Sequence, residues 1–388
     1  MWRTERELEQ QQQNLEYSGK DLRVFIADIL PQNMSEEEEI RDRMLEVENL
    51  VNTYGWVVIL EHVQKRGIPD YKTYIGSGKM DEMIDEMKLK ECNLLILGNI
   101  LKPSQIYNIN ELLKPIWAKC WDRVDLILKI FERHAKTTEA RLQIELASIK
   151  HMWPRIFDMG MELGKQAGKW RWETNTEIMK RHLNRRKEAI KKDLSKYARV
   201  RAEHRKGRSR KWFFTVGIVG YTNAGKSSLL NSLTGKWVLA ENKLFATLGT
   251  SVWKLWIEGK QVDDTKYIPW KEILLNDTIG FIRNLPPKLV DAFASTLEDS
   301  IESDILFHVV DASDPKVHEK IQVVDDILEK IWATQKKLYV FNKIDMISED
   351  QKKKLMEEFQ DLDVLFVSSK DQAWFTELKE RLLVEATY

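Results

Sequence analysis

The chain has 388 residues, enough for two or three domains, and 43% of them are apolar, which excludes a wholly disordered or collagen-like protein. Two cysteines exclude a disulfide framework. Basic and acidic side chains number 61 each, yet residues 180–211 hold 15 basic and 3 acidic ones. This excess predicts a polyanionic partner, or alternatively a solvated helix face.

The N-terminal part predicts a small α/β domain. Residues 1–50 carry 13 acidic and 6 basic side chains, and we expect them to be largely helical. Apolar runs at 55–63 and 92–100 then alternate with amphipathic stretches, as in a parallel α/β layer that ends near Leu128. We therefore assign residues 1–129 to an acidic segment and a small α/β domain.

Residues 130–207 predict a long antiparallel helical hairpin. Apolar residues recur at helical spacing up to Pro154, and a glycine-containing break at 159–170 separates them from a second periodic stretch. The apolar positions are Ala135, Leu142, Leu146, Ile149 and Trp153, then Ile178, Leu183, Ile190, Leu194 and Tyr197. We expect a basic linker at 204–211 to follow.

Residues 212–388 predict one doubly wound α/β domain with a mostly parallel sheet. Its expected strands begin near 212 and recur at 273–277, 304–310, 338–342 and 363–367. No apolar stretch reaches the roughly 18 residues of a membrane helix, and the first residues lack a signal-peptide core. We expect a cytoplasmic protein without membrane insertion, acting as a monomer.

The segment GYTNAGKS matches the pattern GxxxxGK[ST] between a predicted strand and a predicted helix. Its glycines let backbone N–H groups wrap phosphates, and the helix N-terminus adds partial positive charge. Lys226 is expected to reach the β- and γ-phosphates, and Ser227 to bind Mg²⁺. The predicted phosphate-binding residues are Gly220, Tyr221, Thr222, Asn223, Ala224, Gly225, Lys226, Ser227 and Ser228.

A second motif, DTIG, closes the predicted strand KEILLND. Asp277 stands where a carboxylate holds Mg²⁺ through water, and the backbone N–H of Gly280 is expected to approach the γ-phosphate. Thr278 and Ile279 complete the motif. We assign Lys226 and Gly280 to catalysis.

The base is predicted by NKID, which comprises Asn342, Lys343, Ile344 and Asp345. A fixed carboxylate accepts hydrogen bonds from guanine N1–H and the 2-amino group, neither of which adenine offers. The motif therefore favours GTP and disfavours an RNA-remodelling ATPase. After the last predicted strand, Ser368, Ser369 and Lys370 are placed to contact the base.

The sequence resembles the HflX family of ribosome-associated GTPases. The resemblance rests on YIGSGK at 74–79, on the helical stretch 122–156, and on GYTNAGKS, LFATL, DTIGFIRNLP and NKID. It implies a cytoplasmic GTPase that binds the large ribosomal subunit in its GTP form and splits stalled or idle ribosomes. The alternative is a GTP-gated regulator of an RNA or protein partner away from the ribosome. We interpret GSGK at 76–79 as a structural turn, although the family also suggests ATP or RNA binding there.

The resemblance also implies roles for particular residues. Thr247 becomes the second Mg²⁺ ligand, within the nucleotide-binding segment Phe245, Ala246, Thr247 and Leu248. Phe281 stands where Ras-like enzymes place a water-orienting glutamine, so we expect slow intrinsic hydrolysis. Contacts with ribosomal RNA are expected from Lys165, Lys169, Arg185, Arg186, Lys191 and Lys192.

Tryptophan is unusually frequent and glycine unusually rare. The chain has 14 Trp and 17 Gly, whereas glycine usually makes up about 7% of residues. Trp170, Trp172 and Trp374 stand where the resembled family tends to have glycine. We hypothesise that they are glycines in the native protein, whose source reads UGA as glycine. The alternative is an aromatic loop that stacks on RNA bases.

Overall fold

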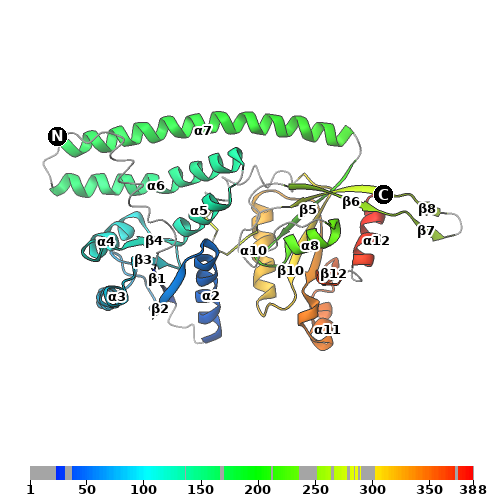
Figure 1. Cartoon of the computed structure of the whole chain (residues 1–388), viewed down its shortest axis with the longest axis horizontal. Helices are drawn as coiled ribbons and strands as arrows, with labels where there is room; N and C mark the ends of the chain where they lie inside the picture. The colour runs from blue at the N-terminus through cyan, green and yellow to red at the C-terminus, as the bar shows by residue number, and fades with distance from the viewer. Residues whose placement is uncertain are drawn as a thin grey trace. The chain divides into compact units, whose positions relative to one another are not determined.

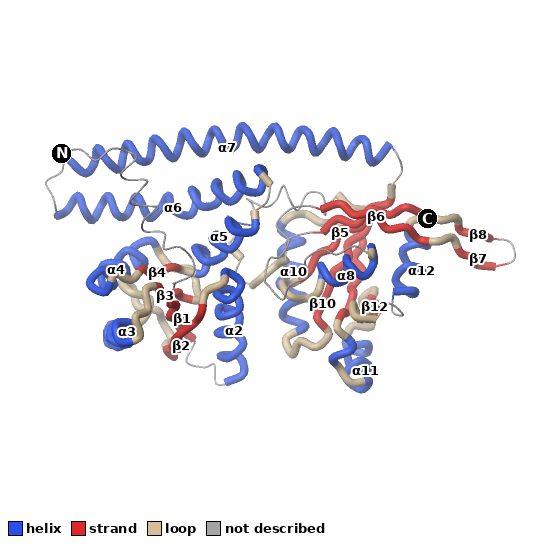
Figure 2. The backbone as a smooth tube through the Cα atoms, in the orientation of Figure 1, coloured by secondary structure: helices blue, strands red, loops and turns tan. Residues whose placement is uncertain are grey.

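The computed structural model divides into two compact units, which are described separately (Figures 1 and 2). The first comprises Met1–Arg133 and Ala147–Glu188, and the second comprises His134–Leu146 and Ala189–Tyr388. The residues that the structure describes are 23–30, 37–135, 137–166, 170–210, 213–235, 251–263, 266–277, 280–283, 285–286, 289, 302–371 and 375–387.

The first unit contains a four-stranded parallel sheet. Its strand order is β2 (Val57–Lys65), β1 (Arg23–Leu30), β3 (Leu94–Leu97) and β4 (Lys119–Trp121). The expectation that residues 1–50 are largely helical is wrong for β1, an inner strand that is buried from Val24 to Leu30. This short apolar run was not recognised as a strand because charged residues flank it in the sequence. In the fold it lies between two neighbouring strands, where apolar residues are favoured.

Helices and one short turn complete this α/β domain. They are α2 (Glu37–Tyr54), α3 (Ser77–Leu89), α4 (Pro103–Leu113), the 3₁₀ turn η1 (Lys114–Ile116) and α5 (Arg123–His134). The expectation of a structural turn at 76–79 is wrong for residues 77–79, which begin α3. Gly76 is the N-cap residue of this helix, and its N–H donates to Gln64 Oε1 at 2.9 Å. Methionines of α3 pack with apolar residues of β1 and β3 in the core.

Two long helices, α6 (Thr138–Gln166) and α7 (Trp170–Arg210), form the predicted hairpin. Two of its predicted boundaries are wrong. Helix α6 continues through Pro154 and the expected break to Gln166, and α7 continues through the expected basic linker. A proline removes one backbone donor, and a long helix that packs along its length can absorb that loss. In the second unit, Arg201 of α7 forms an ion pair with Glu139 of α6, as an antiparallel hairpin requires.

The second unit contains a six-stranded sheet of order β12-β11-β10-β5-β9-β6. The parallel strands are β5 (Phe214–Gly220), β9 (Lys271–Asp277), β10 (Ile305–Asp311), β11 (Lys336–Asn342) and β12 (Val364–Phe366). Strand β6 (Ser251–Ile257) pairs antiparallel with β9, and β7 (Lys260–Asp263) pairs with β8 (Lys266–Ile268).

Helices cover both faces of this sheet. Helices α8 (Lys226–Thr234) and α12 (Phe375–Glu385) share one apolar core with the strands. Helices α10 (Val317–Lys330) and α11 (Glu349–Glu358) pack into the other, close to the 3₁₀ turn η2 (Ile344–Met346). Strand order reverses around β5, so the carboxyl ends of β5, β9 and β10 border the crevice where doubly wound folds bind ligands.

Within the described residues, no helix is both long enough and apolar enough to cross a membrane.

Candidate nucleotide-binding site

The loop between β5 and α8 needs glycine at two positions. Gly220 and Gly225 have positive φ angles of 152° and 91°, which residues with a Cβ rarely adopt. A Cβ at Gly220 would lie 2.3 Å from the carbonyl oxygen of Val309, and one at Gly225 would lie 2.2 Å from Asn342 Nδ2. The backbone can therefore curl only because both side chains are absent, as a phosphate-binding loop requires.

Lys226 is held beneath this loop at the first residue of α8. Its buried Nζ donates to the carbonyl oxygens of Gly220 at 3.1 Å and Tyr221 at 2.8 Å. Burial lowers the pKa of Lys226 to about 8, although the nearby Asp277 carboxylate acts in the opposite direction. The side chain is thus an enclosed cation that an anionic ligand would satisfy.

Asp277 and Ser227 offer donors suited to Mg²⁺. Asp277 is fully buried at the end of β9, and Ser227 follows Lys226 in the first turn of α8. A carboxylate and a hydroxyl are the hard oxygen donors that Mg²⁺ prefers. The residues present therefore fit the ion that the sequence predicts.

Gly280 approaches the loop closely enough to exclude a side chain. A Cβ at this position would lie 2.9 Å from both Lys226 Nζ and Thr222 Cγ2. The backbone of Gly280 therefore lies beside the phosphate loop, where its N–H could serve a terminal phosphate. Phe281 is 1% exposed and pairs with the loop through two hydrogen bonds, from its N–H to Gly220 O at 3.0 Å and from Thr222 N–H to Phe281 O at 2.7 Å.

Asn342 joins three loops at the end of β11. Its Nδ2 donates to the Ala224 carbonyl at 3.0 Å, and its Oδ1 accepts from the N–H and Oγ of Ser369 at 3.1 and 2.8 Å. Ser232 Oγ of α8 donates in turn to the Ser369 carbonyl at 2.7 Å. Asn342 thus fixes the phosphate loop, the NKID motif and the loop after β12, which carries Ser369, to one another.

Asp345 lies in η2 and faces the loop after β12. Ser368 Oγ donates to Asp345 Oδ1 and Lys370 Nζ to Oδ2, both at 2.7 Å. The hydrogen bond from Lys370 lowers the pKa of Asp345, so the carboxylate is ionised at neutral pH. These residues, with Ile344, line a hollow of about 160 Å³, beside the carboxylate that would accept guanine.

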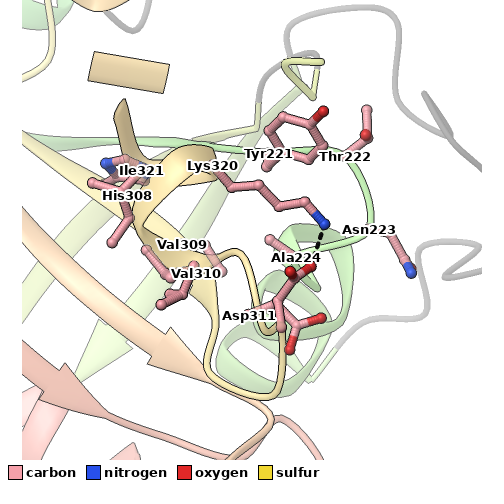
Figure 3. Close-up of a pocket in the computed structure, with 12 residues that line it drawn as sticks. Tyr221, Thr222, Asn223, Ala224, His308, Val309, Val310, Asp311, Lys320 and Ile321 are labelled. Atoms are coloured by element: carbon pink, nitrogen blue, oxygen red, sulfur yellow. Dashed lines mark hydrogen bonds and ion pairs between the residues drawn. The ribbon is translucent and has the colours of Figure 1, made fainter. Parts of the chain in front are cut away.

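A second hollow of about 60 Å³ lies between the phosphate loop and α10 (Figure 3). Lys320 of α10 passes 5.2 Å from the centroid of the Tyr221 ring and forms an ion pair with Asp314. Lys343 Nζ donates to Asp311 Oδ2 at 2.6 Å. Sequence reasoning missed these supporting residues, although the VVDASD run at 309–314, which begins in the last residues of β10, brings acidic side chains to the binding edge of the sheet.

The structure therefore brings together most of the predicted nucleotide-binding residues at one sheet edge. Several predicted residues lie outside the described part: Phe245, Ala246, Thr247, Leu248, Thr278, Ile279, Lys169 and Trp374. The side chains of Lys165, Trp170 and Trp172 also lie outside it. Arg185, Arg186, Lys191 and Lys192 are exposed on α7.

Three family models match the chain in order. A GTP-binding GTPase N-terminal model matches residues 41–132, a GTP-binding GTPase middle-region model matches 134–208, and a 50S ribosome-binding GTPase model matches 215–343.

Individual relatives agree with these matches. GTPase HflX of Methanocaldococcus jannaschii is 37% identical over 321 residues, which cover 81% of this chain and 76% of the relative. GTPase HflX of Caldanaerobacter subterraneus is 37% identical and covers 80% of this chain and 70% of its own. A crystal structure of an SsGBP and GDP complex is 28% identical, has a TM-score of 0.52, and covers 94% of this chain and 99% of that one. Because the described motif residues meet at one sheet edge and relatives at 37% identity are matched over most of their length, the chain belongs to the HflX family of GTPases and is a GTP hydrolase.

Proposed function

We propose that this GTPase binds the large ribosomal subunit in its GTP-bound form and splits or rescues stalled or idle ribosomes in the cytoplasm. One observation carries the proposal. The exposed basic residues of α7 lie on a helix that ends at Arg210, only a few residues before β5 and its phosphate loop. A cationic helix of this kind suits the phosphate backbone of ribosomal RNA. The helix expected to bind RNA and the phosphate loop are therefore close together in the same chain.

The nucleotide end of the mechanism follows from the loop geometry. Lys226, already enclosed by the loop carbonyls, binds the β- and γ-phosphates, and the backbone N–H of Gly280 holds the terminal phosphate. Asp345 accepts hydrogen bonds from guanine. Asn342 holds the base pocket and the phosphate loop together through its hydrogen bond to the loop. Guanine offers the two donors, N1–H and the 2-amino group, that the ionised Asp345 carboxylate can accept, and adenine offers neither.

Mg²⁺ would be held by Ser227, by Asp277 through water, and by Thr247 on the grounds of family resemblance. When bound, the ion neutralises charge on the β- and γ-phosphates and fixes their orientation. A hydroxyl and a fully buried carboxylate beside Lys226 support this assignment.

Intrinsic hydrolysis is slow in this proposal. The Phe281 side chain is buried and its backbone pairs with the phosphate loop, so it cannot orient the attacking water. The ribosome would supply a catalytic group or rearrange the site, and free GTPase would then turn over more slowly than the bound form.

The experiment is co-sedimentation of the protein with purified large subunits, in a non-hydrolysable GTP analogue or in GDP. We expect pelleting with the analogue and little with GDP. Lys226→Ala should abolish the difference, whereas Lys353→Ala, at an exposed position of α11, should preserve it. Equal pelleting in both nucleotides, or none in either, would contradict the proposal and favour a partner away from the ribosome.

A further inference from the structure

Two tryptophans occupy a backbone conformation that favours glycine. Trp117 has φ 57° and Trp332 has φ 60°, both in the left-handed region. A side chain with a Cβ is crowded there, and tryptophan has no short polar group that could compensate by bonding locally. Each residue directly follows the end of a helical segment, η1 for Trp117 and α10 with its C-cap for Trp332.

Both ends have the hydrogen bonds of a Schellman motif. After α10, the Trp332 N–H donates to Glu329 O and the Ala333 N–H to Leu328 O, both at 3.0 Å. These bonds span three and five residues and place Trp332 at the C′ position, where glycine is strongly preferred.

The end of η1 repeats this pattern. The Trp117 N–H donates to Lys114 O at 3.1 Å, and the Ala118 N–H donates to Leu113 O at 3.3 Å. Helix α8 shows the expected residue for a left-handed helix end, because its C-cap is Gly235 with φ 65°.

Side-chain contacts do not account for tryptophan at either position. Trp117 is 82% exposed and Trp332 is 83% exposed, so burial contributes little to offset the backbone cost. Two other non-glycine residues with positive φ have side-chain partners: Tyr74 donates to Asp28, and Lys343 donates to Asp311.

We propose that the native protein carries glycine at positions 117 and 332. A gene whose UGA codons mean glycine, translated with a code in which UGA means tryptophan, produces this substitution at selected tryptophans and leaves those encoded by UGG unchanged. The excess of tryptophan over the whole chain and the shortage of glycine agree with it. The inference is independent of the ribosomal function proposed above, because it rests on backbone geometry in both units.

The first test is the codon at each position. UGA is expected at 117 and 332, and UGG is expected at Trp121, which lies in the extended strand β4 and packs against Trp56 with ring centroids 5.1 Å apart. UGG at position 117 or position 332 overturns the proposal.

The second test measures the stability cost of the backbone conformation, in the protein that carries tryptophan at both positions. Trp117→Gly and Trp332→Gly should each raise the melting temperature of the full chain by about 2–4 °C, because each removes the steric strain of a side chain in the left-handed conformation. Trp117→Ala and Trp332→Ala remove the indole but keep the Cβ, and should give no such rise. Trp121→Gly, the matched change in a strand, should lower it. A glycine variant no more stable than its alanine counterpart would refute the assignment.

Discussion

Asp345 is the residue on which the choice of base depends. Both of its carboxylate oxygens accept hydrogen bonds in the structure, one from Ser368 and one from Lys370. A guanine base must therefore compete with Lys370, which is an exposed side chain on a short loop and can rotate away at small cost. The buried Asn342 beside it cannot do so, because its amide holds the phosphate loop.

Replacing Asp345 by asparagine should exchange the base that the site prefers. Hydrogen bonds to a charged group contribute about 1.5–3 kcal/mol each, so GTP affinity should fall by about 100-fold or more. Xanthosine triphosphate, which offers an acceptor at the matching position, should gain affinity. Calorimetry with both nucleotides measures the exchange, and Asp350→Asn, at an exposed position of α11, is the control. Unchanged preference for GTP would show that Asp345 does not contact the base.

Phe281 illustrates how far a motif alone can be interpreted. Its position after DTIG predicts that no glutamine orients water, whereas its burial and its pairing with Gly220 and Thr222 could not be foreseen from the motif. They arise because Phe281 forms an isolated parallel bridge with Tyr221 of the phosphate loop.

Phe281→Gln should therefore destabilise the GTPase unit without creating a faster enzyme. A buried amide in place of a phenyl ring costs about 2–4 kcal/mol through lost packing and an unsatisfied polar group. Phosphate release should not exceed that of the original protein, and Phe281→Leu should be more stable than the glutamine variant. Denaturant titration and a phosphate-release assay check both parts, and a clear increase in turnover for the glutamine variant would contradict this reasoning.

At the scale of elements, an ionic cluster connects α6 to the start of α5 within the first unit. Asp122 and Asp125 form a reciprocal cap, with the Asp125 N–H donating to Asp122 at 2.9 Å and the Asp122 N–H donating to Asp125 at 3.2 Å. Arg155 Nη1 lies 2.8 Å from both oxygens of Asp125, and Nη2 lies 3.1 Å from Asp122. His151, one turn earlier, lies within 3.5 Å of both carboxylates. The donors of the two aspartates and His151 lie within 4.8 Å of one another, but the Arg155 guanidinium already neutralises this site.

His151 should make the stability of this unit depend on pH. Burial alone lowers the pKa of His151, but hydrogen bonds with Asp122 and Asp125 and the charge of Asp122 raise it overall, against the opposing charge of Arg155. A raised pKa in the folded state means stabilisation that is present below the unfolded value of about 6.5 and is lost as pH rises through the folded value.

The measurement compares the melting temperatures of the original protein and His151→Gln. The original protein should be more stable near pH 6, and its advantage should shrink toward pH 8, because the imidazolium loses its proton. His318→Gln is the control. The exposed ring of His318 faces Glu358, and both residues lie in the second unit, so the same comparison gives the change in melting temperature for a histidine at the surface. A difference for His151→Gln that is constant over this pH range would exclude a charged His151.

The sequence predicts some helices and strands better than others. The strands that end in GYTNAGKS, DTIG and NKID follow from apolar runs bounded by glycine or polar motifs, and the structure confirms them. Strand β1 was not predicted because charged residues surround it, and the ends of α6 and α7 were misplaced because proline and glycine disfavour helix only locally. Packing along a partner helix outweighs such local preferences.

For the whole molecule, the nucleotide site could be predicted because parallel strands end at a common edge. Motifs after β5, β9, β11 and β12 are far apart in sequence, yet the topology brings them together. The supporting contacts could not be predicted, since the ion pair of Lys320 with Asp314 and the cluster around Arg155 depend on helix positions that no single motif encodes. The division into domains at 129–130 and 207–212 stays a prediction.

The net charge of the chain is zero, but basic residues are concentrated in α7, and the salt dependence of RNA binding can detect this concentration. The exposed residues Lys191 and Lys192 belong to the basic stretch of α7, and neutralising contacts between such residues and RNA phosphates release counterions. Each phosphate contact contributes about 0.7 to the slope of log affinity against log salt for a single strand. Changing Lys191 and Lys192 to alanine should therefore reduce the slope for large-subunit binding by about 1.4, while GTP affinity stays the same.

Lys353→Ala with Lys354→Ala removes equal charge from α11 and should leave the slope unchanged. Equal slopes for both double variants would mean that long-range charge, rather than contact through α7, attracts the RNA, because only a direct contact depends on which helix bears the lysines.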